Sequence, residues 1–306
     1  MTIAYLTHPA CRLHDMGGDH PEAPARLAAI EDQLLVTGLE FAICRYDAPA
    51  ATREQLCRVH DADYVERIFS RSPATGLRWL DADTAMNPHT LEAARHAAGA
   101  VVSAVDLVLG GEALCAFCAV RPPGHHAGRS AAMGFCFFNN IAVGAAHALA
   151  QYGLQRIAIA DFDVHHGNGT EEIFQDEPRV LFCSSYQHPF YPFSGNTVPG
   201  PRMVKTPLDA GAGSRTFRLR VGSEWLETLD AFRPELILVS AGFDAHRQEA
   251  VADLNLNERD FGWVTRELCE LANRHAGGRI ISVLEGGYAL PALGRSVAAH
   301  LNALLG

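Results

Sequence analysis

Short apolar runs alternate along this chain with longer stretches that have the period of amphipathic helices. The predicted strands are Thr2–Leu6, Phe41–Tyr46, Ala113–Val120, Arg156–Ala160, Val180–Ser184, Thr216–Val221, Glu235–Ser240 and Arg279–Leu284. The predicted helices are Ala23–Val36, Leu91–Leu109, Ile141–Tyr152, Glu258–His275 and Leu290–Leu304. Because several strands are apolar throughout, this alternation predicts an α/β fold with a mostly parallel central sheet covered by helices on both faces.

No segment of the 306 residues looks like a linker between domains, and no internal repeat is present. We therefore expect a single domain over residues 1–306. The stretch Ser185–Ser214 departs from this compact pattern, because it is rich in Pro, Gly and aromatic residues. Loops of this length are uncommon unless they serve a site, so the stretch is predicted to form a site wall.

Composition and charge exclude several classes of protein. With 48% hydrophobic and 20% charged residues, the chain can bury a large core, which excludes a disordered protein. Acidic residues outnumber basic ones by 35 to 25, and the net charge of −10 repels nucleic acid and anionic lipid. No apolar run is long enough to span a bilayer, and the first residues do not resemble a signal peptide. We expect a cytoplasmic protein with no direct nucleic acid ligand and no membrane contact.

The eight cysteines mostly lie within apolar runs, which in a reducing compartment predicts buried free thiols rather than disulfides. Cys115 and Cys118 have the spacing of a zinc motif. They lie on a predicted strand, however, and side chains at i and i+3 of a strand point to opposite faces. We therefore expect no metal between them.

Ligands of open α/β sheets bind at the carboxyl ends of the strands, and four of the predicted strands run directly into polar residues. The four polar segments are Arg121–His126, Asp161–Gly169, Ala241–His246 and Glu285–Tyr288. Two of them contain adjacent histidines, in a chain that has 15 histidines. Together these segments predict one catalytic site at the carboxyl edge of the sheet.

The segment Asp161–Gly169 carries a pattern that suits a divalent cation. Asp161, Asp163 and His165 share strand parity, so their side chains leave the sheet on the same side. With Asp244 from a second strand, Asp163 and His165 would supply three N/O ligands and leave a fourth position for water, as in catalytic zinc sites. Asp161 would then orient a neighbouring imidazole. A hydrogen-bonded turn network without metal is the alternative interpretation.

His125 and His126 follow another strand, where an imidazole can take a proton from a metal-bound water and return it to a leaving group. Tyr288 follows two glycines, which allow a tight turn, and its hydroxyl could donate to an oxyanion opposite the metal. In isolation, the two histidines could equally be loop residues and the tyrosine a packing residue.

Motifs that cover nearly the whole chain resemble those of the histone deacetylase superfamily. They are His20-Pro-Glu-Ala-Pro-Ala-Arg26, Arg121-Pro-Pro-Gly-His-His-Ala127, Gly134-Phe-Cys-Phe-Phe-Asn-Asn140, Asp161 to Gly169, Ser240-Ala-Gly-Phe-Asp-Ala-His246 and Glu285-Gly-Gly-Tyr288. The resemblance is to the class II and bacterial branch, and it implies the arginase-like α/β fold.

By position, the resemblance implies one catalytic zinc ion on Asp163, His165 and Asp244. It also implies that Asp161 supports His125, which tunes the electrostatics, and that Asn168 lies near His126. In the family, the histidine at the position of His126 acts as general base and then general acid. The tyrosine at the position of Tyr288 polarises the acetyl carbonyl together with zinc.

The resemblance further implies a structural potassium ion. Its ligands would be Asp161, Ser184 and backbone carbonyl groups around Asp163, His165 and Ser185.

Five positions match the acyl-lysine channel of the family. Gly134, Phe135 and Tyr191 would grip the stem, Arg26 would lie at the foot, and Val251 falls where polyamine-selective relatives can place an acidic gatekeeper.

Some residues near this channel differ from those of relatives. Tyr186 and Phe193 are expected to add bulk at its mouth. The neutral Val251 favours acyl-lysine as substrate, although the acidic Glu249 and Asp253 flank it.

These observations favour a zinc-dependent deacetylase that hydrolyses N-acetyl-lysine in protein or peptide and releases acetate. The alternative on the same scaffold is an acetylpolyamine amidohydrolase. A binuclear manganese ureohydrolase would need a second Asp-x-Asp, which the segment around Asp244 lacks, and a non-catalytic acetyl-lysine-binding module would be expected to have lost Tyr288 or the histidine pair. The ligand set also suits Fe(II), Co(II) or Mn(II). The sequence leaves open whether the chain forms a homo-oligomer.

Overall fold

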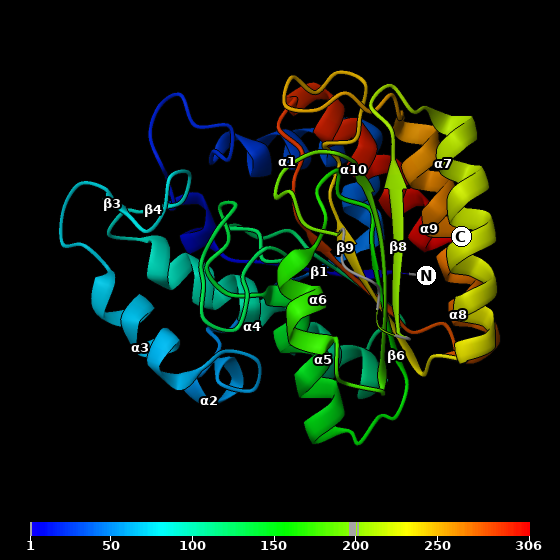
Figure 1. Ribbon diagram of the computed structural model, residues 1–306, viewed down its shortest axis with the longest axis horizontal. Helices are drawn as coiled ribbons and strands as arrows, with labels where there is room; N and C mark the ends of the chain where they lie inside the picture. The colour runs from blue at the N-terminus through cyan, green and yellow to red at the C-terminus, as the bar shows by residue number, and fades with distance from the viewer. Residues whose placement is uncertain (1, 196–199, 201) are drawn as a thin grey trace.

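The computed structural model describes residues 2–195, 200 and 202–306, and its centre is an eight-stranded sheet (Figure 1). In spatial order the strands are β2 (Ile43–Asp47), β1 (Ile3–Thr7), β5 (Cys115–Cys118), β10 (Ile280–Leu284), β9 (Leu236–Ala241), β6 (Ile157–Asp161), β7 (Val180–Gln187) and β8 (Met203–Leu208). Neighbouring strands all pair in parallel. The prediction of an α/β fold with a parallel central sheet is confirmed.

Helices cover both faces of this sheet (Figure 1). On one side, α4 (Thr90–Leu109) packs against α5 (Asn140–Gln151) and against β1, β5 and β10. On the other side, α1 (Ala25–Thr37) packs against α10 (Leu290–Leu305), which packs against α9 (Glu258–His275). The remaining helices are α2 (Arg53–Leu56), α3 (Ala62–Arg71), α6 (Asn168–Phe174), α7 (Ser214–Val221) and α8 (Glu227–Phe232). A short antiparallel pair, β3 (Arg78–Trp79) and β4 (Ala85–Met86), lies outside the main sheet.

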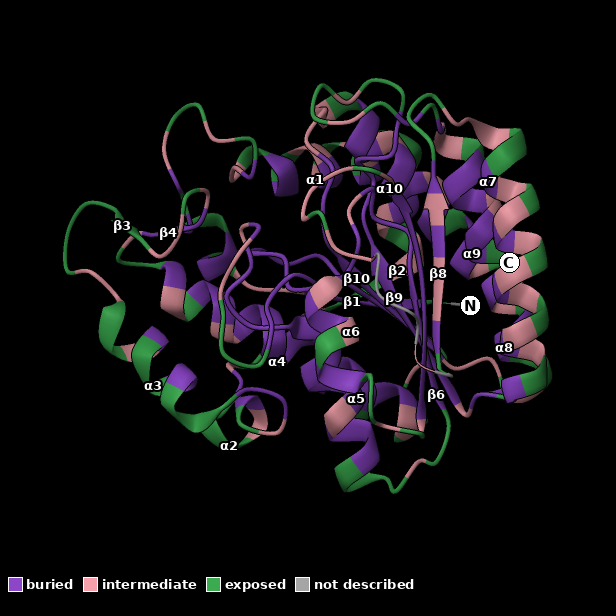
Figure 2. Ribbon diagram, viewed as in Figure 1, coloured by how far each residue is buried: buried purple, intermediate pink, exposed green. Residues whose placement is uncertain are grey.

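The central strands are buried along their whole length (Figure 2). Because helices cover both faces, most side chains of these strands pack against apolar neighbours, and this explains their predominantly apolar sequences. Edge strand β2 contains only half-buried and exposed residues instead. Among the described residues, no helix is both long and apolar enough to cross a membrane.

The predicted strand Thr216–Val221 is wrong, because these residues belong to helix α7. Apolar residues alternate at Phe217, Leu219 and Val221, which imitates the period of a strand. Phe217 and Val221 are also four residues apart, so they share one face of a helix and are buried, whereas Leu219 is 68% exposed. The helical period decides the structure.

The stretch Ser185–Ser214 is less irregular than predicted. β7 extends to Gln187, and Met203–Leu208 forms β8 at the edge of the sheet, where Pro207 is tolerated. The part between these strands includes residues 196–199 and 201, which lie outside the described residues.

Candidate active site and metal centre

The four polar segments predicted from the sequence meet at one edge of the sheet. β5, β10, β9 and β6 are neighbours in that order, and all run in the same direction. Their carboxyl ends therefore lie side by side, and the residues that follow each strand share one site.

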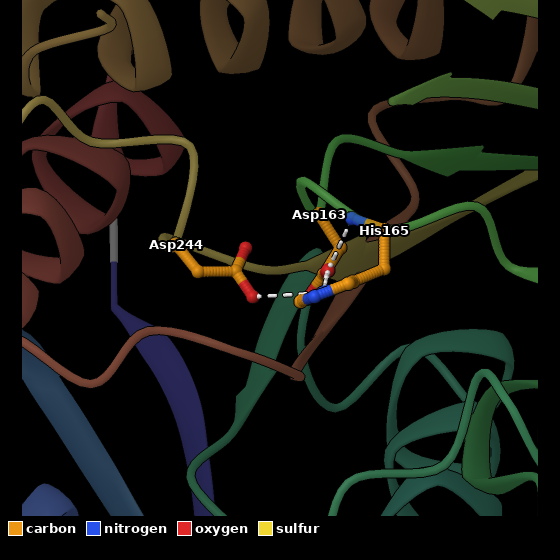
Figure 3. Close-up of side chains that lie close together, drawn as sticks. All are labelled: Asp163, His165 and Asp244. Carbon is orange, nitrogen blue, oxygen red and sulfur yellow. Dashed lines mark hydrogen bonds and ion pairs between the residues drawn. The ribbon is translucent and has the colours of Figure 1, made fainter. Parts of the chain in front are cut away.

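Asp163, His165 and Asp244 lie together at this edge (Figure 3). One ligand atom from each lies within 4.8 Å of the others. The Nδ1 of His165 is 2.9 Å from Oδ1 of Asp163 and 3.2 Å from Oδ2 of Asp244. The backbone fixes both carboxylates, since Gly286 N–H donates to Asp163 Oδ2 and Val164 N–H donates to Asp244 Oδ1. The structure thus brings the predicted metal ligands together.

This cluster fits a divalent cation. Oδ2 of Asp244 is buried, and its contact with His165 Nδ1 at 3.2 Å is an ion pair rather than a hydrogen bond, so this oxygen has no regular hydrogen-bond donor among the described residues. Two carboxylates and an imidazole are also ligands that Zn²⁺ and related ions accept. Gly286 leaves the space that the cluster needs, because a Cβ there would lie 2.0 Å from Asp244 Oδ2.

The adjacent histidines His125 and His126 have ring centroids 4.1 Å apart but different partners. The Nδ1 of His125 donates to Asp161 Oδ2 at 2.9 Å, whereas the Nδ1 of His126 donates to Asn168 Oδ1 at 2.7 Å. Since Nδ1 of His126 carries a proton, its Nε2 is the proton acceptor when the ring is neutral.

Their pKa values move in opposite directions. Burial lowers the pKa of both rings, but the negative charges of Asp161 and Asp163 outweigh burial at His125 and raise its pKa well above the usual value. At His126, burial and the positive charges of His125 and His165 hold the pKa well below the usual value. His126 is therefore neutral at pH 7, as a general base must be.

A narrow cavity of about 100 Å³ opens over His125 and His126. Its lining residues are Asp83, Pro123, His125, His126, Gly134, Phe135, His165, Tyr191, Gly286 and Tyr288. The structure thus places the predicted Gly134, Phe135, Tyr191 and Tyr288 around the same space as the histidine pair.

Arg26 and Val251 do not line this cavity. Arg26 is buried behind Tyr288, with its guanidinium carbon 5.0 Å from the centroid of the tyrosine ring, and it donates to the backbone oxygens of Glu285 and Gly287. Val251 is 36% exposed.

Residues 20–304 match the model of the histone deacetylase domain. The chain belongs to the histone deacetylase family. This membership places it among hydrolases that act on amide bonds.

Individual members of the histone deacetylase family align over nearly the whole chain. The histone deacetylase-like amidohydrolase of Pseudomonas aeruginosa is 39% identical over 92% of this chain and 77% of its own length. The polyamine deacetylase HDAC10 of Mus musculus is also 39% identical, over 93% of this chain and 45% of its own length. The crystal structure of the HDA15 HD domain superposes with a TM-score of 0.94 at 33% identity, and covers 99% of this chain and 88% of that one.

Two carboxylates near the candidate active site make contacts that the sequence did not predict. Asp83 lines the cavity and accepts a hydrogen bond from Gly134 N–H at 3.2 Å. Glu249 accepts hydrogen bonds from the backbone N–H groups of Tyr288 and Ala289. Neither residue directly follows a strand, which was the sequence signal used to find the site.

The expectation for Tyr186 requires correction. Tyr186 is on β7, 2% exposed, with its ring centroid 4.6 Å from that of His166, so its bulk fills the interior rather than the channel mouth. Phe193, in contrast, is 75% exposed and has a φ of 58°, and it follows the cavity residue Tyr191 by two positions.

Proposed function

We propose that this chain is a zinc-dependent deacetylase that hydrolyses the amide of N-acetyl-lysine in protein or peptide. The observation that supports this most directly is a cluster of three metal-ligand side chains whose His165 lines the same narrow cavity as the neutral His126 and Tyr288. Family membership agrees with an amide hydrolase, and the donor set agrees with zinc.

Asp163, His165 and Asp244 would hold the zinc ion. When bound, zinc would polarise the acetyl carbonyl and lower the pKa of a coordinated water. Protein side chains would carry out the proton transfers and stabilise the oxyanion.

His126 is proposed to move the proton. Its Nε2 is free to accept a proton, because Asn168 holds the other nitrogen as a donor. The same imidazole can then give that proton to the departing lysine amine. His125, charged because of Asp161, would add positive charge beside the developing oxyanion.

Tyr288 is proposed to donate its hydroxyl to that oxyanion. Burial, together with the negative charges of Asp244 and Asp163, raises the pKa of Tyr288 well above its usual value. The phenol therefore keeps its proton at neutral pH, as a hydrogen-bond donor must.

A structural potassium ion is part of the same proposal. Asp161 and Ser184 are paired residues on the neighbouring strands β6 and β7, so a ligand set of Asp161, Ser184 and carbonyl groups near Asp163, His165 and Ser185 is compact. Hard oxygen ligands of this kind suit an alkali metal ion that stiffens the loop after β6.

Acetylpolyamines are the second candidate substrates, and Asp83 is the observation that favours them. It brings a carboxylate into the cavity lining, where a cationic amine could approach. Acetyl-lysine is preferred because the position predicted for an acidic gatekeeper holds Val251, and because the neighbouring Glu249 has its Oε1 bonded to the backbone.

The deciding experiment compares kcat/KM for an acetyl-lysine peptide with that for N-acetylputrescine. Protein stripped with a chelator should lose activity on both and regain it with Zn²⁺. Faster cleavage of the peptide supports the lysine proposal, and faster cleavage of the polyamine replaces it with the second candidate. No turnover of either, in zinc-restored protein, refutes both.

A further inference from the structure

Glu249 connects two distant segments of the chain next to Tyr288. It lies between β9 and α9, and its Oε1 accepts hydrogen bonds from Tyr288 N–H at 2.8 Å and from Ala289 N–H at 2.9 Å. These two amides directly precede α10, whose own N-cap residue provides no side-chain hydrogen bond. A carboxylate 39 residues away in sequence therefore satisfies them.

The two residues before Tyr288 are held by other partners: Gly286 N–H donates to Asp163, Gly286 O accepts from Phe243 N–H, and Gly287 O accepts from Arg26. Gly287 has a φ of 118°, a region open to glycine, so the turn itself depends on this residue. The ring of Tyr288 contacts Arg26 on one side and Phe135 at 6.0 Å between centroids. These contacts hold the ring, but the two hydrogen bonds to Glu249 hold the backbone from which it projects.

We propose that Glu249 is a positioning residue for Tyr288, and that its carboxylate sets the direction in which the tyrosine hydroxyl enters the cavity. This inference rests on the proposed function, in which Tyr288 donates to the oxyanion. A displacement of about 1 Å in a reacting group can cost on the order of 100-fold in rate, so the two hydrogen bonds are expected to matter for turnover.

The neighbouring residue provides a matched control. Gln248 accepts a hydrogen bond from Arg295 of α10 at 2.8 Å, so it joins the same two segments but does not contact Tyr288. Arg295 also donates to Glu258 at the start of α9, so the arginine side chain stays anchored when Gln248 is shortened. Gln248→Ala is therefore expected to keep wild-type turnover.

The kinetic test is a double-mutant cycle of Glu249→Ala and Tyr288→Phe. Glu249→Ala should lower kcat by about 10- to 100-fold with little change in KM, since it affects an interaction made in the transition state. In the Tyr288→Phe background, the same substitution should change kcat by no more than about twofold. An equal loss in both backgrounds would show that Glu249 does not act through the tyrosine hydroxyl, and would overturn the proposal.

Glu249→Gln covers the case in which the alanine variant folds poorly. The amide oxygen can still accept from both N–H groups but carries no charge, so kcat should fall by less than in Glu249→Ala. A glutamine variant as impaired as a folded alanine variant would contradict the hydrogen-bond explanation.

Amide hydrogen exchange separates this inference from the proposed function, because it requires no substrate. Peptides that contain Tyr288 and Ala289 should exchange faster in Glu249→Ala than in the wild type or in Gln248→Ala, with the central strands unchanged. If the wild type cleaves neither substrate but exchange rises as described, the proposed function fails and the anchoring of this backbone stands. Unchanged exchange would overturn the inference itself.

Discussion

At the scale of single residues, the site assigns two neighbouring imidazoles to different charge states. Asp161 is negatively charged beside His125, whereas the amide of Asn168 beside His126 is neutral. The carboxylate beside one ring and the neutral amide beside the other therefore contribute to the separation of an electrostatic role from a proton-transfer role, together with burial and the charges of Asp163 and His165.

Replacing Asn168 with Asp should raise the pKa of His126, because a carboxylate would favour the charged ring. The protonated ring cannot accept a proton, so kcat should fall at the acid side of the pH profile. Opposite charges at this distance shift pKa values by about one to three units. A pH profile of kcat that is identical in Asn168→Asp and wild type would exclude His126 as the titrating base.

Replacing Tyr288 with Phe should lower kcat by about 10²- to 10³-fold, the usual effect of removing one oxyanion donor. The ring contacts with Arg26 and Phe135 do not need the hydroxyl, so the melting temperature should change little. The measurement is steady-state kinetics beside thermal unfolding. Near-normal turnover in a folded variant would remove Tyr288 from the mechanism.

At the scale of secondary-structure elements, the turns after the central strands carry the residues of the proposed chemistry. The turn after β10 is short and rich in glycine, and it lies directly against the metal-ligand cluster. Its amide at Gly286 also holds Asp163. This turn therefore shapes the candidate metal site, although none of its side chains belongs to the cluster of Asp163, His165 and Asp244.

Gly286→Ala should weaken metal binding, because the new Cβ would lie 2.0 Å from Asp244 Oδ2. Zinc affinity can be measured by competition with a chromogenic chelator. Gly222→Ala is the control: it lies in a helical segment, nothing lies within 4 Å of its added Cβ, and a small gain in stability is expected. Equal zinc affinity in the two variants would mean that the turn adapts to the methyl group.

Strand ends could be predicted from the sequence because an apolar run followed by polar residues is a local signal. Helix α7 could not be predicted, because its alternating apolar residues fit both the period of a strand and that of a helix. Packing decides between the two. β8 was missed because an edge strand that contains Pro207 lacks a continuous apolar run. The contacts of Asp83 and Glu249 depend on side-chain directions in loops, which no sequence period encodes.

At the scale of the whole molecule, buried neutral histidines outside the site link folding stability to pH. His60 receives a hydrogen bond from Asn139 N–H and bonds Gly128 O, and burial lowers its pKa to about 4. His300 lies between Thr265 and Ser282, and burial lowers its pKa to about 3. In the unfolded chain both titrate near 6.5.

Acidification should therefore destabilise the protein. Below pH 6.5 the unfolded chain binds protons at His60 and His300 that the folded chain does not, so unfolding becomes more favourable as the pH falls towards 4. At pH 5 each histidine contributes a loss of about 2 kcal/mol relative to pH 8. Calorimetry in buffers of different ionisation enthalpy measures the proton uptake directly. An absence of uptake on unfolding at pH 5 would contradict this account.

The position of β10 in the sheet has a consequence for synthesis on the ribosome. Residues 280–284 form this strand, yet it lies between β5 and β9, which come from residues 115–118 and 236–241. Until β10 leaves the exit tunnel, the nascent chain holds two half-sheets, each with an apolar, unpaired inner edge. Such edges attract other chains, so the emerging polypeptide should need chaperone protection until β10 pairs with both half-sheets, and this same pairing should bring the proposed active-site segments together in one step.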